Sequence, residues 1–457
     1  MRTRIQSPNS ELNNLDLVLF GDIRDFVRTA AAILKSRAVK INPRFNTFLL
    51  SLRSADLEIS GPKTQSKSRK VTASLPADPL QKDLLLRDFT INAIAEPLAP
   101  KHGKYVDPSG GIRDLEKRLI RTPLDPRITL IDDPLRILRA ARLASQLHFS
   151  LDAKLLEAMY EERKRILTVS SERRTAELLK ILQSSKPSIG LKLLYITRVL
   201  DVAFPEIAAL ANMKQDKRHG HKDVFEHTLK VLDSVAQFEG TLETRLAALL
   251  HDVGKPATRR FEAELGWTFH GHEVVGERIV KRLGREWKLA NSTVDRVSKL
   301  VRLHMRPINL TDEGVTDSAV RRLGVQADGD IDELLKLCRA DVTSSDPKRV
   351  RRYLENFERV VAHLRSVEEK DQLRRFQSPV RGEVIMAETG LEPCPLVGKL
   401  KKMIEEAILN GKIPNEYDAA LEYLRSIKDS VLRADSGEMQ NGREETNSVE
   451  GSAAEPS

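Results

Sequence analysis

The chain has 457 residues, with 75 Lys and Arg against 66 Asp and Glu, a formal net charge of +9 at pH 7. This length predicts two to four domains, and the basic balance favours a polyanionic partner. Only two cysteines occur, and no run of about 18 apolar residues could span a bilayer, which excludes a disulfide framework, a cysteine zinc site and a membrane protein. We expect a cytoplasmic protein.

Strand-like patterns occur only near the start of the chain, and helical patterns follow. The expected strands are at 15–20, 46–52 and 55–60. From about residue 112 the apolar spacing becomes helical, as at 136–147, 227–238 and 350–364. The final residues, 431–457, are rich in Ser, Glu, Gly and Asn and are expected to be disordered. The predicted fold class is α+β, a small mixed α/β part followed by a mostly α-helical part.

The first expected strand carries a polar pair. Asn14 and Asp16 share a face of this strand because side chains alternate with a period of two. Carboxylates at that spacing would hold a divalent metal, but the amide of Asn14 carries no charge. Glu58 could add a carboxylate from an adjacent strand, although a solvent-facing Glu is the simpler interpretation.

Polar residues cluster again in the block LLLRDFTINAIAEPL, residues 84–98. Arg87 can hold phosphate oxygens, while Asp88 and Asn92 can hold ribose hydroxyls. Alternatively, Arg87 and Asp88 pair with each other at the end of a strand or helix. The following segment DPSGG, residues 107–111, predicts either a flexible joint or an ordinary tight turn.

A third block, IDDPLRILRAARLASQLHF, begins a helix at residues 131–149. Asp133 and Arg136 stand three residues apart, so they project from one side of its start and could hydrogen-bond the pairing edges of a base. Alternatively, an aspartate caps the helix before Pro134, and the arginines form a solvated basic face. The residues of that face are Arg136, Arg139 and Arg142.

These three blocks, in this order, resemble the class II nucleotidyltransferases, the bacterial CCA-adding enzymes and poly(A) polymerases. The resemblance extends from about residue 12 to residue 427. It implies tRNA, CTP and ATP as partners and Mg²⁺ held by Asp16, with Asp16 and Glu58 as the candidate catalytic carboxylates. It also implies nucleotide binding by Arg87, Asp88, Asn92, Asp133, Arg136, Arg139 and Arg142.

The chain departs from the family pattern in three places. Asn14 stands where the first carboxylate of an Asp-x-Asp pair is usual, and Leu86 stands where the first of two arginines is usual. The glycine-rich loop of the GGxVRD type, which binds triphosphate ahead of the first strand in this family, does not occur. We therefore expect an incomplete head and impaired transfer.

A second constellation resembles the HD metal-dependent phosphohydrolases. It includes HKDVFEHTLKVLD, LAALLHDVGKPATRR, FHGHEVVGERI, VRLHMRP and CRADVTSSDP. The resemblance implies a divalent transition metal, since imidazole and carboxylate suit such ions. The implied ligands are His227, His251, Asp252 and Asp341, with His272 and His304 for a second metal. Lys255, after Gly254, would contact phosphate, unless it is a solvated lysine at a helix end.

The resemblance divides the chain into five parts. We expect a nucleotidyltransferase head at 1–115, a nucleotide-selecting helical neck at 116–200, an HD domain at 201–365, a tRNA-binding helical tail at 366–430 and a disordered end at 431–457. The expected function is addition of CMP and AMP to tRNA 3′ ends. Two alternatives stay open: a phosphohydrolase whose transferase head has decayed, and a non-catalytic RNA-binding relative.

Overall fold

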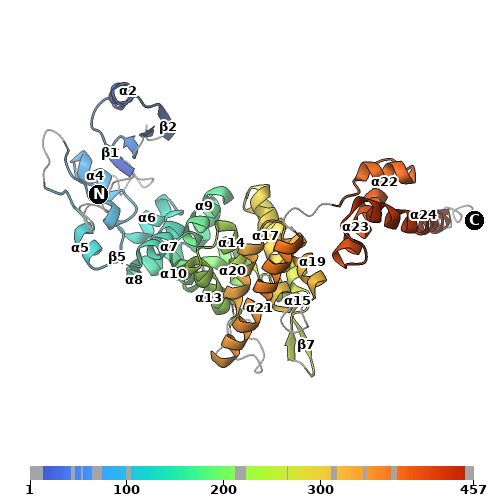
Figure 1. Cartoon of the computed structure of the whole chain (residues 1–457). Coiled ribbons are helices and arrows are strands. Elements are labelled where there is room, and N and C mark those ends of the chain that lie inside the picture. The colour runs from blue at the N-terminus through green and yellow to red at the C-terminus, as the bar shows by residue number, and fades with distance from the viewer. Residues whose placement is uncertain are drawn as a thin grey trace, which may run out of the picture. The chain divides into compact units, whose positions relative to one another are not determined.

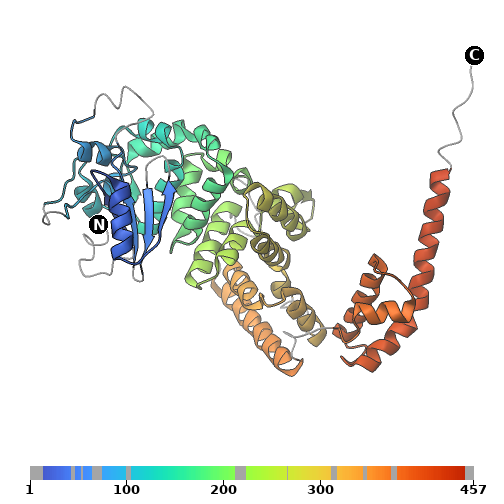
Figure 2. The same ribbon diagram turned by 90° about the horizontal axis from the view of Figure 1, so that it is seen from above.

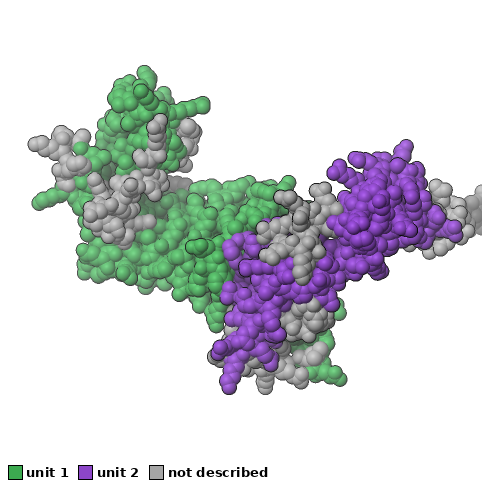
Figure 3. All heavy atoms as spheres, viewed as in Figure 1, with its two compact units in different colours: residues 1–302 green, residues 303–457 purple. Residues whose placement is uncertain are grey.

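The structure is a computed structural model, and every structural statement below concerns the residues that it describes. These are 14–42, 47–52, 55–63, 75–98, 104–211, 223–264, 266–309, 316–342, 347–371 and 378–447. The chain divides into two compact units, Met1–Arg302 and Leu303–Ser457 (Figure 3).

The first unit begins with a four-stranded sheet in the order β1-β4-β3-β2 (Figures 1 and 2). β1 is parallel to β4, and the other neighbours are antiparallel. Helix α2 packs on the sheet, where Val27 joins a small core with the buried Leu50 and Ile59. The three expected strands are confirmed, while β2 and α2 were not predicted. The bounds are β1 (Asn14–Val18), α2 (Ile23–Ile33), β2 (Ala38–Asn42), β3 (Thr47–Ser51) and β4 (Asp56–Ser60).

A connecting region follows, in which residues 107–111, predicted to be either a flexible joint or a tight turn, form a turn at Pro108 and Ser109 that leads into helix α5. Asp107 accepts hydrogen bonds from the backbone amides of Gly111 (2.7 Å) and Ile112 (2.9 Å). A Cβ atom at Gly111 would lie 2.0 Å from the carbonyl oxygen of Thr90, so only glycine fits this close contact. The elements are α4 (Pro79–Leu85), η2 (Thr90–Asn92), α5 (Gly111–Glu116) and β5 (Leu119–Ile120).

Helices make up the next part of the first unit. Helix α7 coincides with the helix expected at 136–147, and it packs against α9 and α10. Short β5 pairs in parallel with β6, inside a region where only helices were expected. The elements are α6 (Pro126–Asp132), α7 (Arg136–Leu147), β6 (Ser150–Leu151), α8 (Ala153–Glu161), η3 (Arg163–Thr168), α9 (Ser171–Leu182), α10 (Pro187–Ile196), α11 (Leu200–Ala203) and α12 (Pro205–Ala208).

The last part of the first unit is helical except for a β-hairpin, β7–β8, which lies between α15 and α16 in the chain and was not predicted. The Arg245 guanidinium joins this part to the preceding helices, because it donates 2.9 Å hydrogen bonds to the carbonyls of Leu182 and Ser184. The elements are α13 (Val224–Gln237), α14 (Leu242–Leu250), α15 (Lys255–Thr258), β7 (Arg260–Glu262), β8 (Gly266–Thr268), α16 (His272–Glu286) and α17 (Asn291–Leu303), the last of which ends in the second unit.

The second unit is helical, and the buried residues Val380, Ile385, Leu400 and Leu424 belong to one of its cores. Helix α24 continues to Asn447, past residue 431, and the rest of the segment expected to be disordered, 448–457, lies outside the described residues. A helix that packing has already formed gains a hydrogen bond with each added residue, which accounts for this extension. No described helix is long and apolar enough to cross a membrane. The elements are α18 (Arg306–Asn309), α19 (Asp317–Ala327), α20 (Ile331–Asp341), α21 (Pro347–Asp371), α22 (Gly382–Thr389), α23 (Pro395–Leu409) and α24 (Tyr417–Asn447).

Candidate active sites

Two candidate carboxylates meet on the head sheet. Asp16 of β1 and Glu58 of β4 are register partners on parallel strands, and both side chains are exposed. Leu57 and Ile59, which alternate with Glu58, are buried against the opposite face. Partial desolvation and the Asp16 charge raise the pKa of Glu58, while Arg87 lowers it. The structure therefore brings Asp16 and Glu58 together as a like-charged pair that a divalent cation would stabilise.

A third carboxylate on this face was missed from the sequence. Asp56 is exposed and is the register partner of Asn14, two residues before the Asp16–Glu58 pair on the same two strands. Its position two residues before Glu58 in an alternating strand was the available signal. Opposite position 14, where β1 has an amide residue rather than a carboxylate, β4 thus supplies Asp56.

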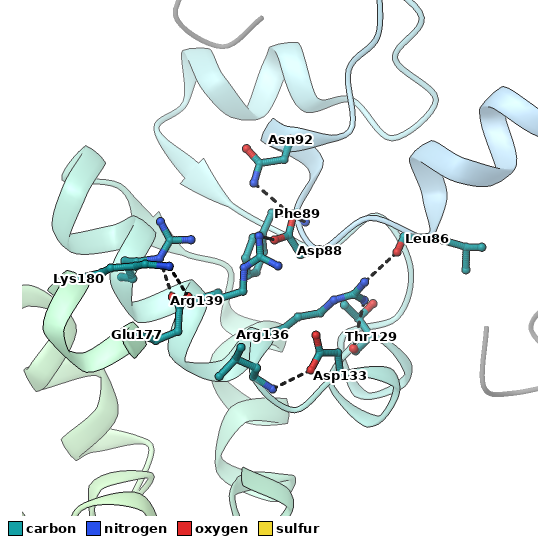
Figure 4. A network of polar contacts seen from close by, with 12 residues as sticks. Leu86, Asp88, Phe89, Asn92, Thr129, Asp133, Arg136, Arg139, Glu177 and Lys180 are labelled. Atoms are coloured by element: carbon teal, nitrogen blue, oxygen red, sulfur yellow. Dashed lines mark hydrogen bonds and ion pairs between the residues drawn. The ribbon is translucent and has the colours of Figure 1, made fainter. Parts of the chain in front are cut away.

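Asp88 is a buried anchor, 6% exposed, rather than half of a pair with Arg87. Its carboxylate accepts hydrogen bonds from the Phe89 amide (2.9 Å) and Asn92 Nδ2 (3.2 Å), and Arg139 Nη2 lies 2.8 Å away (Figure 4). Burial alone would raise the pKa of Asp88, but the charges of Arg139 and Arg136 and these hydrogen bonds hold it below its usual value.

Arg87 instead pairs with Asp83, with Nε 3.0 Å from Oδ2. The alternative in which Arg87 and Asp88 pair with each other is therefore wrong. The charge of Arg87 lowers the pKa of Glu58.

Arg136 is buried at the start of α7, with 5% of its surface exposed. Its guanidinium donates to the carbonyl oxygens of Leu86 (2.9 Å) and Thr129 (3.3 Å), as Figure 4 shows. Burial lowers the pKa of Arg136, and the nearby Asp88 and Asp133 oppose this shift. The alternative of a solvated basic face is therefore wrong at Arg136, because packing of α6 and α7 against the Leu86 segment encloses this side chain.

Asp133 is more accessible and lies beside the start of α7. It follows the last residue of α6, and its Oδ1 accepts a hydrogen bond from the Leu135 amide at 3.3 Å. Its side chain is 33% exposed, with Arg173 3.7 Å away. The structure places Asp133 and Arg136 close together, with the carboxylate outside and the guanidinium inside.

Lys63 is a second cation here that the sequence did not single out. Its Nζ donates to the Leu86 carbonyl at 3.2 Å, and its amide donates to Asp83 Oδ1 at 2.7 Å. Burial and the charge of Arg136 lower the pKa of Lys63. A lysine in a polar, basic stretch gave no signal that distinguished it from its neighbours.

Helix α9 supports α7 through a buried carboxylate. Arg142 of α7 donates from Nε to Glu177 Oε2 at 2.6 Å, and Lys180 lies 3.3 Å from the other oxygen of Glu177 (Figure 4). The Arg142 side chain is 15% exposed and is paired with Glu177. The Arg139 side chain, paired with Asp88, is more accessible, at 37% exposed.

Four candidate metal ligands gather in the helical part of the first unit. Nε2 of His251 lies 3.4 Å from Nε2 of His227 and 3.3 Å from Asp252 Oδ2, while His272 Nε2 lies 3.6 Å from Asp252 Oδ1. Lys255 Nζ lies 2.7 Å from the same carboxylate, so it is an ion-pair partner rather than a solvated lysine.

The histidine tautomers suit metal binding. Nδ1 of His251 donates to the Ala248 carbonyl and Nδ1 of His272 to the Phe269 carbonyl, both at 2.9 Å, which leaves the lone pair on Nε2. Burial lowers the pKa of His272 and so favours the neutral, ligating form. Burial would raise the pKa of Asp252, but His251, Lys255 and His227 hold it well below its usual value. This donor set fits a divalent transition metal.

Gly254 allows these groups to approach each other. A Cβ atom on Gly254 would lie 2.1 Å from the carbonyl oxygen of His272 at the start of α16. Its φ of −80° is ordinary, so the close backbone contact, not a special turn, requires glycine here.

The two remaining candidates belong to the second unit. His304 directly follows α17 and is fully buried, and Asp341 is the last residue of α20. Between them, Cys338 Sγ donates to the His304 carbonyl at 3.0 Å, which ties α20 to the end of α17. Their place in a metal site stays a prediction.

Family models match three parts of the chain. The poly A polymerase head domain matches residues 9–121, the probable RNA and SrmB-binding site of polymerase A matches 148–210, and the HD domain matches 224–346. The HD match includes residues of both compact units.

Curated and solved relatives agree with these matches. The chain is 34% identical over 351 residues to a CC-adding tRNA nucleotidyltransferase of Thermus thermophilus, covering 74% of this chain and 76% of the relative. It is 32% identical to an A-adding tRNA nucleotidyltransferase of Deinococcus radiodurans over 354 residues, 74% and 78% of the two chains. The fold is similar to the Bacillus stearothermophilus CCA-adding enzyme in complex with CTP, with a TM-score of 0.55, 20% identity and coverage of 89% and 85%. The chain therefore belongs to the tRNA nucleotidyltransferase family, in its group of bacterial CCA-adding enzymes with an HD domain.

Proposed function

We propose that this protein transfers CMP and AMP from CTP and ATP to the 3′ end of tRNA in the cytoplasm. The 3′ hydroxyl oxygen bonds to the α-phosphorus and loses its proton, the bond from that phosphorus to the β-phosphate oxygen breaks, and pyrophosphate leaves. The observation that carries the proposal is the register of β1 and β4, which places Asp16 opposite Glu58 on adjacent strands. The similarity to a CC-adding and to an A-adding tRNA nucleotidyltransferase supports transfer to tRNA.

Each part of the head has a separate task. Asp16 and Glu58 would hold Mg²⁺, which when bound neutralises charge on the reacting phosphate. Arg87 and Lys63 would bind phosphate oxygens, and Arg139 would contact the nucleotide from a position fixed by Asp88. Asn92 would hold ribose from the other side of Asp88.

Base selection would depend on Asp133 and Arg136. The exposed Asp133 carboxylate is an acceptor, and the described contacts of Arg136 use two of its five N–H donors. Arg142 would act indirectly, because its contact with Glu177 sets the position of α7. Selection of CTP and ATP over GTP and UTP would then follow from donors and acceptors that the fold holds in place.

The test is incorporation of labelled CTP and ATP into tRNA lacking its 3′ CCA, and into tRNA lacking only the final A. We expect Asp16→Ala and Glu58→Gln to lose at least 100-fold in rate, as removal of charge stabilisation does in other enzymes. His251→Ala, outside the head, is the matched control and should retain transfer. Full activity in Asp16→Ala would disprove the assignment of this sheet face.

A second activity is supported by the other cluster. We propose that His227, His251, Asp252 and His272 hold divalent transition metal and that His304 and Asp341 complete their ligand sets. Lys255 would bind the phosphate of a phosphoester such as a 2′,3′-cyclic nucleotide. The converging Nε2 atoms around Asp252 carry this proposal. Metal analysis and hydrolysis assays of wild type and His251→Ala test it, and equal metal and equal activity in both would remove it.

A further inference from the structure

The β7–β8 hairpin presents an exposed aromatic face. Phe261 and Trp267 are register partners, and their rings meet edge to face with centroids 5.2 Å apart. The Arg259 guanidinium lies over the Trp267 ring, 3.8 Å from its centroid. Phe261 is 65% exposed and Trp267 38% exposed, so solvent reaches both rings. Figure 1 shows the hairpin extending beyond helix α15.

The opposite face of the hairpin is polar. Arg260 pairs in register with Thr268, and Thr268 Oγ1 donates to Glu262 Oε1 at 2.7 Å. A two-stranded hairpin has no core of its own, so part of its aromatic face stays exposed to solvent after folding. Exposed aromatic rings of this kind are typical of binding surfaces.

The aromatic face continues to the proposed metal cluster. Phe269 follows Trp267 by two residues, and its ring centroid lies 5.8 Å from Lys255 Nζ. The carbonyl of Phe269 accepts hydrogen bonds from both Nδ1 and the amide of His272. Lys255 and His272, at the two ends of the hairpin, are therefore linked through Phe269.

We propose that the nucleobase of a nucleotide phosphoester stacks on Trp267, with Phe261 against the edge of the base, while its phosphate lies at Lys255. The inference rests on the proposed phosphohydrolase function. A base offers a flat π face to the rings, and Arg259 and Lys255 supply positive charge toward the phosphate, which suits an anionic nucleotide better than an uncharged ligand. Because stacking recognises any base, the site accepts all four nucleobases.

The kinetic test compares two cyclic phosphodiesters, one with a nucleoside and one without. Adenosine 2′,3′-cyclic phosphate carries ribose and base, while glycerol 1,2-cyclic phosphate has the same five-membered phosphodiester ring without either. We expect Trp267→Ala to raise KM for the adenosine compound about 10- to 100-fold with kcat unchanged, the effect of losing one stacked base. Its kinetics with the glycerol compound should equal those of wild type.

Two arginines give a matched pair of variants. Arg259→Ala and Arg260→Ala each remove one positive charge from the hairpin, but only Arg259 stacks on Trp267. We expect Arg259→Ala to raise KM for the adenosine substrate and Arg260→Ala to leave that KM unchanged. Equal effects of the two variants would show a general charge effect and overturn the stacking assignment.

A binding measurement separates this inference from the hydrolase itself. The chain has two tryptophans, and Trp287 is buried against Phe204. Titration with AMP should quench fluorescence in wild type and not in Trp267→Phe. Quenching without hydrolysis of either diester would support the stacking face and reject the hydrolase. Hydrolysis of both diesters with identical kinetics in wild type and Trp267→Ala, and no quenching, would reject the stacking face alone.

Discussion

Replacing Arg136 with alanine tests whether this residue holds the nucleotide-selecting helix in place. The side chain is 5% exposed and donates hydrogen bonds to two main-chain carbonyls, those of Leu86 and Thr129. An exposed arginine would be replaceable at little cost, as the sequence had suggested. A buried arginine that joins two segments is not.

The size of the effect follows from these two contacts. A hydrogen bond from a charged donor contributes about 1.5–3 kcal/mol. The Leu86 carbonyl keeps a second donor, Lys63 Nζ, so its loss falls at the lower end of that range. We therefore expect Arg136→Ala to destabilise the start of α7 by about 3 kcal/mol. Arg173→Ala is the control, because its side chain is 57% exposed and 3.7 Å from Asp133, so about 0.5 kcal/mol or less is expected.

Hydrogen–deuterium exchange is the suitable assay, because both tryptophans lie outside this region and fluorescence would not report on α7. Peptides covering 126–147 should exchange about 100-fold faster in Arg136→Ala, since 1.4 kcal/mol corresponds to a factor of ten. Nucleotide selection is measured on the same preparations. Unchanged exchange together with lost selection would refute the packing argument and assign Arg136 to base contact alone.

Three further predictions follow from the two sites. Asn14→Asp should increase CMP and AMP incorporation at least tenfold, because it returns a charge to the metal-binding face; a rate equal to that of wild type would show that Asp56 already supplies it. Asp88→Asn should have a lower free energy of unfolding than wild type above pH 4. Urea unfolding at several pH values should show this difference in free energy becoming smaller below pH 4. The pKa of Asp88 is lowered in the folded protein, so the charged carboxylate stabilises the fold fully above its unfolded pKa of about 3.9, and this stabilisation is lost as pH falls through the folded pKa. A difference in unfolding free energy that is constant with pH would contradict this. Gly254→Ala should destabilise the His272 region by about 1–3 kcal/mol and reduce metal content, as measured by tryptophan fluorescence during urea unfolding and by metal analysis, whereas wild-type values would show that the backbone contact can relax.

The sequence predicted what depends on local pattern. Alternation located β1, β3 and β4, and helical spacing located α7 to the residue, because in each case the buried face follows the period of the element. Strand β2 and the β7–β8 hairpin were missed. β7 and β8 have three residues each, too few to show an alternating pattern, and strands of that length are stabilised by pairing with a neighbour.

Side-chain environments could not be predicted in the same way. The burial of Arg136 depends on Leu86, fifty positions earlier in the chain, and the pairing of Asp88 with Arg139 likewise joins two separate blocks. Asp56 becomes relevant only through its register with Asn14. Composition and spacing identify which residues carry chemistry, but tertiary packing decides which of them face solvent.

The carbonyl of Leu86 has a consequence for exchanging parts between relatives. It accepts hydrogen bonds from both Lys63 and Arg136, and the planar peptide that it belongs to fixes the amide of Arg87. Residues 63 and 86–88 therefore pack as one unit with the start of α7. A chimera that takes residues 116–200 from another family member should be active only if residues 63 and 86–88 come from the same protein. The arginine at the start of its helix must hydrogen-bond the main-chain carbonyl at position 86.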